Sequence, residues 1–204
     1  MGTLYSCGRS RGMRVTWAAE EMGLDMDLVL LPFPPRAAAP EFLEINPLGT
    51  VPAYVEGDMV MTESTAILHY LAETAGGGAL MLDRTDPEYG CFLDFLYHAD
   101  ATLTVPQTVY MRFVMMEKER GLEEAGYAYM RWFQARLTKV GERLEGRDYL
   151  CANRFTIADI AVGYALYLTT LNGLSDSLSP VLAAYLDRLM TRPAFARALQ
   201  REHG

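Results

Sequence analysis

The stretch from Asn46 to Leu71, NPLGTVPAYVEGDMVMTESTAILHYL, is the most informative part of this sequence. Its first four residues are typical of a turn, because proline presets φ and glycine adopts conformations that other residues avoid. Two short apolar segments, 53–55 and 59–61, lie on either side of Glu-Gly-Asp and predict a β-hairpin. A helix is expected from Ser64 onward. The predicted order is therefore turn, strand, strand, helix.

Two features of this stretch indicate a binding site for a peptide-like anion. Val51-Pro52 opens the first strand, where proline cannot donate to the sheet and where a cis bond costs least, so we predict a cis bond. The Val51 N–H and C=O would then be free to pair with a peptide-like ligand. Glu63 and Ser64 open the next helix, where unpaired N–H groups and the helix dipole attract a carboxylate.

This combination resembles the glutathione site of the glutathione transferase family, and the resemblance extends over nearly the whole chain. It implies that Val51, before the cis proline Pro52, pairs with the cysteinyl backbone of glutathione. It also implies that Glu63 and Ser64 hold the γ-glutamyl end. A hairpin and helix that only complete a thioredoxin-like sheet remain the plainer interpretation of the same residues.

Thr50 departs from the family pattern. Many relatives carry lysine or another long polar residue at this point, where it helps to hold the glycyl carboxylate of glutathione. Thr50 is too short to reach as far. Glutathione is therefore expected to bind weakly unless Arg9, Arg11 or Arg36 compensates.

The residues after the first predicted strand carry the expected thiol chemistry. The segment 5–15, YSCGRSRGMRV, leads from that strand to a helix N-terminus, which favours a thiolate. A free thiol is mostly protonated at neutral pH (unperturbed pKa about 8.5), so the site needs a hydrogen-bond donor aimed at the sulfur. Ser10-Arg11 is similar to bacterial members with Ser-Arg at the start of this helix, which implies that Ser10 stabilises the thiolate. A one-residue shift would place Arg9 there instead, and Ser10 as a simple helix cap is the structural alternative.

Cys7 offers a different chemistry. Cys7-Gly8-Arg9-Ser10 has the form Cys-x-x-Ser, which places a reactive cysteine at a helix N-terminus in thioredoxin-like folds. The protein would then be a glutathione-dependent thiol transferase. Cys7 as a small buried residue at the strand end is the plainer alternative. A third interpretation is a non-enzymatic protein-interaction module, which Thr50 and the unsettled position of Ser10 support.

The N-terminal part of the chain predicts an α/β, thioredoxin-like domain over residues 1–75 that binds glutathione. A strand at 3–6, a helix with apolar residues at 15–22 and a buried strand at 27–31 form a βαβ unit. The hairpin and its helix complete the domain.

The remaining residues predict a linker at 76–87 and an all-helical domain at 88–204 that holds the electrophile pocket. Pro106 implies a break in the first long helical segment. Thr156 and Asp159 have the spacing of a capping box, and they start an almost entirely apolar helix that should be central to the domain.

Composition argues against several classes of function. The chain has 204 residues, with 50% hydrophobic and 22% charged, which is typical of globular proteins. A net charge of −8 argues against binding to nucleic acid or to anionic membranes. No apolar run is long enough to span a membrane. Three widely spaced cysteines without a CxxC predict neither a metal cluster nor a disulfide framework, and they favour a reducing, cytoplasmic setting.

The expected function is therefore that of a glutathione transferase, with glutathione as co-substrate and a small hydrophobic electrophile as second substrate. The resemblance also implies a homodimer, with the first helices of the second domain packed across the two-fold axis.

Overall fold

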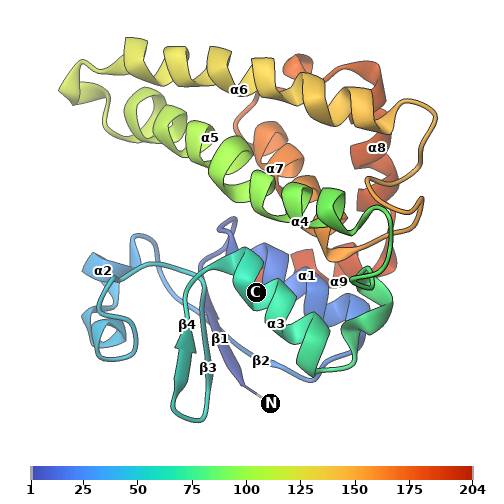
Figure 1. Ribbon diagram of the computed structural model, residues 1–204. Helices are drawn as coiled ribbons and strands as arrows, with labels where there is room; N and C mark the ends of the chain where they lie inside the picture. The colour runs from blue at the N-terminus through green and yellow to red at the C-terminus, as the bar shows by residue number, and fades with distance from the viewer. Residues whose placement is uncertain (1, 204) are drawn as a thin grey trace. The chain divides into compact units, whose positions relative to one another are not determined.

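The computed structural model describes residues 2–203, which form two compact units (Figure 1). The first unit contains the chain up to Met81 and again from Met190 onward, and the second contains Leu82–Leu189.

The first unit is built on a four-stranded sheet in the order β2-β1-β3-β4. Strand β1 (Thr3–Ser6) pairs in parallel with β2 (Asp27–Leu30) and antiparallel with β3 (Ala53–Glu56). Strand β3 pairs antiparallel with β4 (Met59–Met61), as the predicted hairpin requires. This mixed sheet confirms the predicted thioredoxin-like domain.

Helices cover both sides of this sheet. Helix α1 packs against both α3 and α9, and Figure 1 shows α2 on the opposite side of the sheet from α1 and α3. On the side of the sheet that α1 covers, the core includes Trp17 and Phe195, whose rings meet edge to face with their centroids 4.9 Å apart. The helices of this unit are α1 (Gly12–Met22), α2 (Pro35–Ala38), α3 (Ser64–Thr74), α9 (Pro193–His203) and two 3-10 turns, Pro40–Glu44 and Gly77–Leu80.

Two expectations for this unit were wrong in detail. Strand β2 was expected to be buried, but Val29 and Leu30 are each 38% exposed, because β2 forms one edge of the sheet, beside β1. The residues of α9 were assigned to the helical domain 88–204, whereas α9 belongs to the first unit. Ion pairs from Glu20 on α1 to Arg197 and Arg201 hold it there.

The second unit is helical and is organised around α7 (Ile157–Leu171), in which every residue from Ile157 to Leu166 is buried. The predicted capping box is confirmed, because Asp159 accepts a hydrogen bond from the Thr156 N–H at 2.8 Å. The other helices are α4 (Tyr89–His98), α5 (Val105–Tyr110), α6 (Glu123–Leu144) and α8 (Pro180–Met190), with π-helical segments at Ala99–Thr104 and Met111–Met116 and 3-10 turns at Lys118–Arg120 and Ser175–Ser177.

The expected break at Pro106 takes the form of a change in helix type. The chain turns from α-helical to π-helical at Ala99–Thr104 and returns to α-helix with Pro106 in the first turn of α5. Proline has no N–H for the preceding turn, and the wider π-helical turn accommodates this.

The fold also brings together two cysteines that are far apart in the sequence. The sulfur atoms of Cys91 and Cys151 lie 3.8 Å apart, and Cys7, Cys91 and Cys151 are all unbridged. None of the helices formed by residues 2–203 is long and apolar enough to cross a membrane.

Candidate functional site

The loop from β1 to α1 is compact and folds back on the strand. The Ser10 N–H donates to the Cys7 carbonyl at 3.1 Å, and Arg9 adopts a left-handed conformation with φ of 65°. Gly12 is required here, because a Cβ at this position would lie 1.9 Å from the Ser6 hydroxyl oxygen. The loop therefore holds the hydroxyl groups of Ser6 and Ser10 close together at the start of α1.

The Ser10 hydroxyl is surrounded by defined partners. Its oxygen accepts hydrogen bonds from the backbone N–H of Gly12 at 3.2 Å and of Cys7 at 3.4 Å. It also lies 3.3 Å from the Ser6 hydroxyl, where either group can donate. Because the two backbone bonds use the oxygen as acceptor, the Ser10 hydrogen is available for donation. Ser10 thus accepts one N–H group of the first turn of α1 and one of the loop, and it can also serve as a donor.

Cys7 lies in an environment that does not activate a thiol. The side chain is 1% exposed, and its sulfur is 3.6 Å from the Pro32 carbonyl oxygen that accepts its hydrogen bond. Burial, together with the nearby charge of Glu202, raises the pKa of the Cys7 thiol to about 11. At neutral pH only about one such thiol in ten thousand is ionised. The geometry therefore fits the buried alternative for Cys7 and not the redox one.

A second site element lies at the start of α3. Glu63 occupies the N-cap position and is exposed, whereas Ser64 is buried in the first turn. The guanidinium of Arg14, which is fully buried on α1, donates to the Ser64 hydroxyl at 2.9 Å. A buried positive charge beside a helix N-terminus attracts an anion, and the Ser64 hydroxyl keeps its own hydrogen for donation to it.

A third element is the turn before β3. The Val51-Pro52 bond is cis, as predicted. Asn46 fixes the turn by donating from its side chain to the Thr50 carbonyl at 2.8 Å and the Thr50 hydroxyl at 3.2 Å. Pairing of β3 with β1 begins at Ala53, so half-buried Val51 lies just beyond the paired residues.

Arg36 also contributes to this turn. Its guanidinium donates to the carbonyl oxygens of Leu48 at 2.9 Å and Pro47 at 3.4 Å. Arg36, one of the cations expected to compensate for the short side chain of Thr50, is thus engaged in bracing the turn. Thr50 itself is exposed.

The sheet register brings these elements to one end of the first unit. Tyr5 on β1 pairs with Ala53 on β3, so the loop after β1 and the residues before β3 leave the sheet at the same end. The bond between Arg14 and Ser64 joins the N-terminal region of α1 to that of α3 at this end. Arg11 is the N-cap residue of α1.

Sequence reasoning missed two buried charged residues in this site. Arg14 received no role within the segment 5–15, although an arginine between Met13 and Val15 in a largely apolar helix was a detectable signal. Glu202 gave no signal, since a single glutamate near the end of an amphipathic helix is usually exposed to solvent. It is 2% exposed and accepts hydrogen bonds from Ser6 and Thr16.

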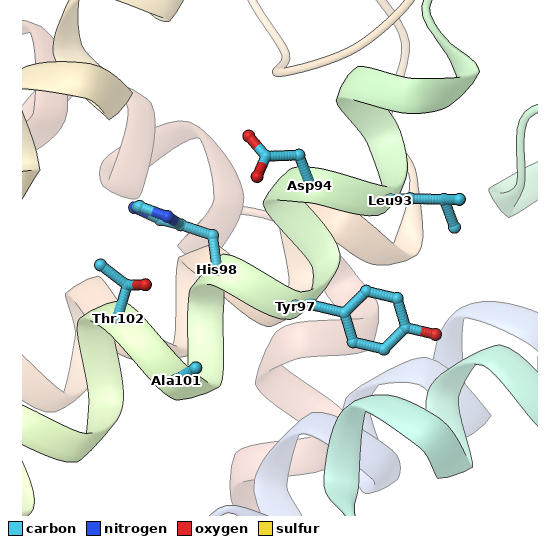
Figure 2. Close-up of a pocket in the computed structure, with 6 residues that line it drawn as sticks. All are labelled: Leu93, Asp94, Tyr97, His98, Ala101 and Thr102. Carbon is cyan, nitrogen blue, oxygen red and sulfur yellow. The ribbon is translucent and has the colours of Figure 1, made fainter.

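The second unit carries a separate shallow hollow on α4 and the π-helical segment after it (Figure 2). Figure 2 shows the Tyr97 ring and the His98 ring pointing to opposite sides of the helix. Burial and the nearby Lys139 lower the pKa of His98. The hollow is lined by Leu93, Asp94, Tyr97, His98, Ala101 and Thr102.

Comparisons with known proteins agree with this architecture. Residues 1–73 match the glutathione S-transferase N-terminal domain, and residues 109–193 match the C-terminal domain of the same family. A glutathione S-transferase of Hyoscyamus muticus is 29% identical over 196 residues, which is 92% of each chain. Glutathione S-transferase 2 of Schizosaccharomyces pombe is 30% identical over 167 residues, covering 78% of this chain and 71% of the relative.

A solved structure shows the same fold along the full length of the chain. The glutathione transferase of Methylococcus capsulatus superimposes with a TM-score of 0.84 at 26% identity, covering 100% of this chain and 99% of the other. With both domain matches and the relatives above, the chain belongs to the glutathione S-transferase family.

Proposed function

We propose that this protein binds glutathione at the shared end of the sheet and joins it, through its sulfur, to a small hydrophobic electrophile. Membership of the family supports the transferase reaction. The observation that carries the mechanism is the Ser10 hydroxyl, whose oxygen accepts two backbone N–H bonds and whose hydrogen can be donated to the glutathione sulfur. Cys7, in contrast, is buried with a raised pKa.

The remaining contacts follow from the three site elements. The Val51 backbone pairs with the cysteinyl backbone of glutathione, next to cis Pro52. The Ser64 hydroxyl and the N-terminus of α3 hold the γ-glutamyl carboxylate, with Arg14 behind them, and exposed Glu63 holds the amine. Thr50, in the turn beside Val51, is the residue expected to face the glycyl carboxylate.

The chemistry needs a thiolate that attacks the electrophile and forms a thioether. The α1 N-terminus stabilises negative charge on the sulfur, and Ser10 supplies a directed hydrogen bond. Arg11, the N-cap residue, adds positive charge at the same helix end. The helical unit, Leu82–Leu189, provides the electrophile pocket.

The decisive variant is Ser10→Ala. One hydrogen bond to a charged sulfur contributes about 1.5–3 kcal/mol, so conjugation at neutral pH should fall roughly ten- to a hundredfold. Ultraviolet absorbance of the bound thiolate should show a raised pKa for the glutathione thiol. Cys7→Ala is the matched control and should retain conjugation.

If Cys7→Ala abolishes activity and mass spectrometry finds glutathione on Cys7, the protein is a thiol transferase. Failure to bind immobilised glutathione would favour the interaction module.

We also propose that the protein is a cytoplasmic homodimer that uses α4 and the hollow beside it. Tyr97 on α4 is 48% exposed at this hollow, and two-fold dimers are the commonest oligomers. Tyr97→Glu should convert dimer to monomer in light scattering. Tyr129→Glu is the control, since Tyr129 is 39% exposed on α6 and lies outside this surface. A monomeric protein at micromolar concentration would contradict the proposal.

A further inference from the structure

Glu202 on α9 is a buried carboxylate for which the reaction above has no use. It is 2% exposed, and it lies against the end of β1 and the first turns of α1. Its carboxylate accepts hydrogen bonds from the Thr16 hydroxyl at 2.6 Å and from the Ser6 hydroxyl at 2.9 and 3.1 Å. A buried carboxylate is costly unless it is well hydrogen-bonded, so its position calls for an explanation.

A continuous chain of hydroxyl groups joins this carboxylate to the proposed thiol site. An ionised carboxylate only accepts hydrogen bonds, so Ser6 gives its hydrogen to Glu202. The Ser6 oxygen can then accept from the Ser10 hydroxyl, 3.3 Å away. Every hydrogen in the chain therefore points from Ser10 toward Glu202, and an incoming thiol reaches the Ser10 oxygen in place of the longer of its two backbone bonds, the 3.4 Å bond from the Cys7 N–H.

We propose that Glu202 is the terminal acceptor of the thiol proton of glutathione, reached through Ser10 and Ser6. The proposal rests on the role of Ser10 given above. The thiol proton moves to the Ser10 oxygen, the Ser10 proton to the Ser6 oxygen, and the Ser6 proton to the carboxylate. One S–H bond breaks, one O–H bond forms on Glu202, and the total charge is unchanged.

The reversed chain then stabilises the product of this transfer. Protonated Glu202 donates to Ser6, Ser6 donates to Ser10, and Ser10 donates to the thiolate. After the sulfur has attacked the electrophile, Glu202 releases its proton to solvent along with the leaving group. Ser10 is therefore acceptor before the transfer and donor after it, which requires a proton acceptor at the far end of the chain.

The buried surroundings of Glu202 favour a neutral carboxyl group, and the negative charge of a nearby thiolate favours it further. Burial raises the pKa of Glu202, although bonds from Thr16 and Ser6 and the nearby charges of His203 and Arg201 oppose this. Glu202 in turn raises the pKa of the neighbouring Cys7 thiol, which shows how an ionised Glu202 acts on a sulfur at this site. Moving the proton to Glu202 removes that repulsion.

The test counts the protons released when glutathione binds to the purified protein. Calorimetry at neutral pH in buffers of different ionisation enthalpy gives this count, and ultraviolet absorbance shows that the thiolate has formed. The wild-type protein should form thiolate with little proton release, because Glu202 keeps the proton. Glu202→Gln should release about one proton for each thiolate formed. Its conjugation rate at neutral pH should fall on the order of tenfold and recover at higher pH.

Three further variants separate this relay from a structural role. Ser6→Ala interrupts the chain but keeps the carboxylate, and it should release protons as Glu202→Gln does. Glu202→Asp keeps an acceptor and should restore the low proton count. Glu20→Gln removes another carboxylate contact between α1 and α9, to Arg197 and Arg201, and should change neither the proton count nor the pH profile.

Two results would overturn the relay. One is a wild-type protein that releases a full proton per thiolate, and the other is a Glu202→Gln variant with an unchanged proton count and pH profile. A Ser10→Ala variant that still forms the thiolate would instead remove the proposed role of Ser10, whatever the proton count of the Glu202 variants.

Discussion

The N-termini of α1 and α3 both present a serine hydroxyl, but the two hydroxyls are linked by hydrogen bonds to buried groups of opposite charge. At α3, Ser64 accepts a hydrogen bond from the guanidinium of Arg14. At α1, Ser10 contacts Ser6, which donates to the carboxylate of Glu202. A hydroxyl that is hydrogen-bonded to a cation suits a ligand that is already an anion. A hydroxyl that is linked to a carboxylate suits a ligand that must first lose a proton. The buried partner thus distinguishes the two serines.

Removing the cation at the α3 end should have the largest effect. Arg14→Met should weaken glutathione binding by roughly a hundredfold, since losing a buried charged hydrogen-bond partner costs about 2–5 kcal/mol. Calorimetry with S-methylglutathione, which keeps the carboxylates but has no thiol, measures this end alone. Ser10→Ala should bind the same ligand almost normally. If both variants lose affinity equally, the two helix ends do not have separate roles.

The next prediction tests whether the sulfur chemistry at the α1 end belongs to the ligand and not to Cys7. Burial and Glu202 raise the pKa of Cys7 from 9.0 to about 11. The raised pKa stabilises the fold fully below pH 9, and this contribution is lost as the pH rises toward 11, because the unfolded thiol ionises first. Between these pH values the wild type should lose about 2 kcal/mol more than Cys7→Ala in free energy of unfolding. Parallel urea titrations of both proteins check this, and equal losses would contradict the buried, inactive state of Cys7.

The smallest effect is expected for Ser64→Ala. The variant loses one hydroxyl donor to the γ-glutamyl carboxylate but keeps the helix N-terminus and the Arg14 charge, so the dissociation constant of glutathione should rise about tenfold. The pKa of the bound thiol should stay unchanged when followed by ultraviolet absorbance. A shifted thiol pKa with normal affinity would mean that Ser64 acts on the sulfur. The roles assigned to Ser64 and Ser10 would then be wrong.

Parts of the molecule with strong local signals were predictable from the sequence. The turn before Val51-Pro52 and the cis bond follow from proline and glycine, whose backbone preferences act within a few residues. The capping box of Thr156 and Asp159 is equally local. The thioredoxin-like domain and the glutathione S-transferase family were accessible for the same reason, because the hairpin and its following helix carry these signals in continuous order.

Tertiary structure alone decided which charged and thiol groups are buried and what they contact. Glu202 bonds to Thr16 and Ser6 across 186 and 196 residues of chain, a pairing that depends on α9 packing against α1. The same packing places α9 in the first unit and contributes to the raised pKa of Cys7. Local propensity reports backbone conformation, whereas desolvation and hydrogen bonding of a charge depend on neighbours that the chain brings from a distance. The sequence therefore determined the scaffold and the positions of the helix ends. Packing determined which buried charged group is linked to the serine at each helix end.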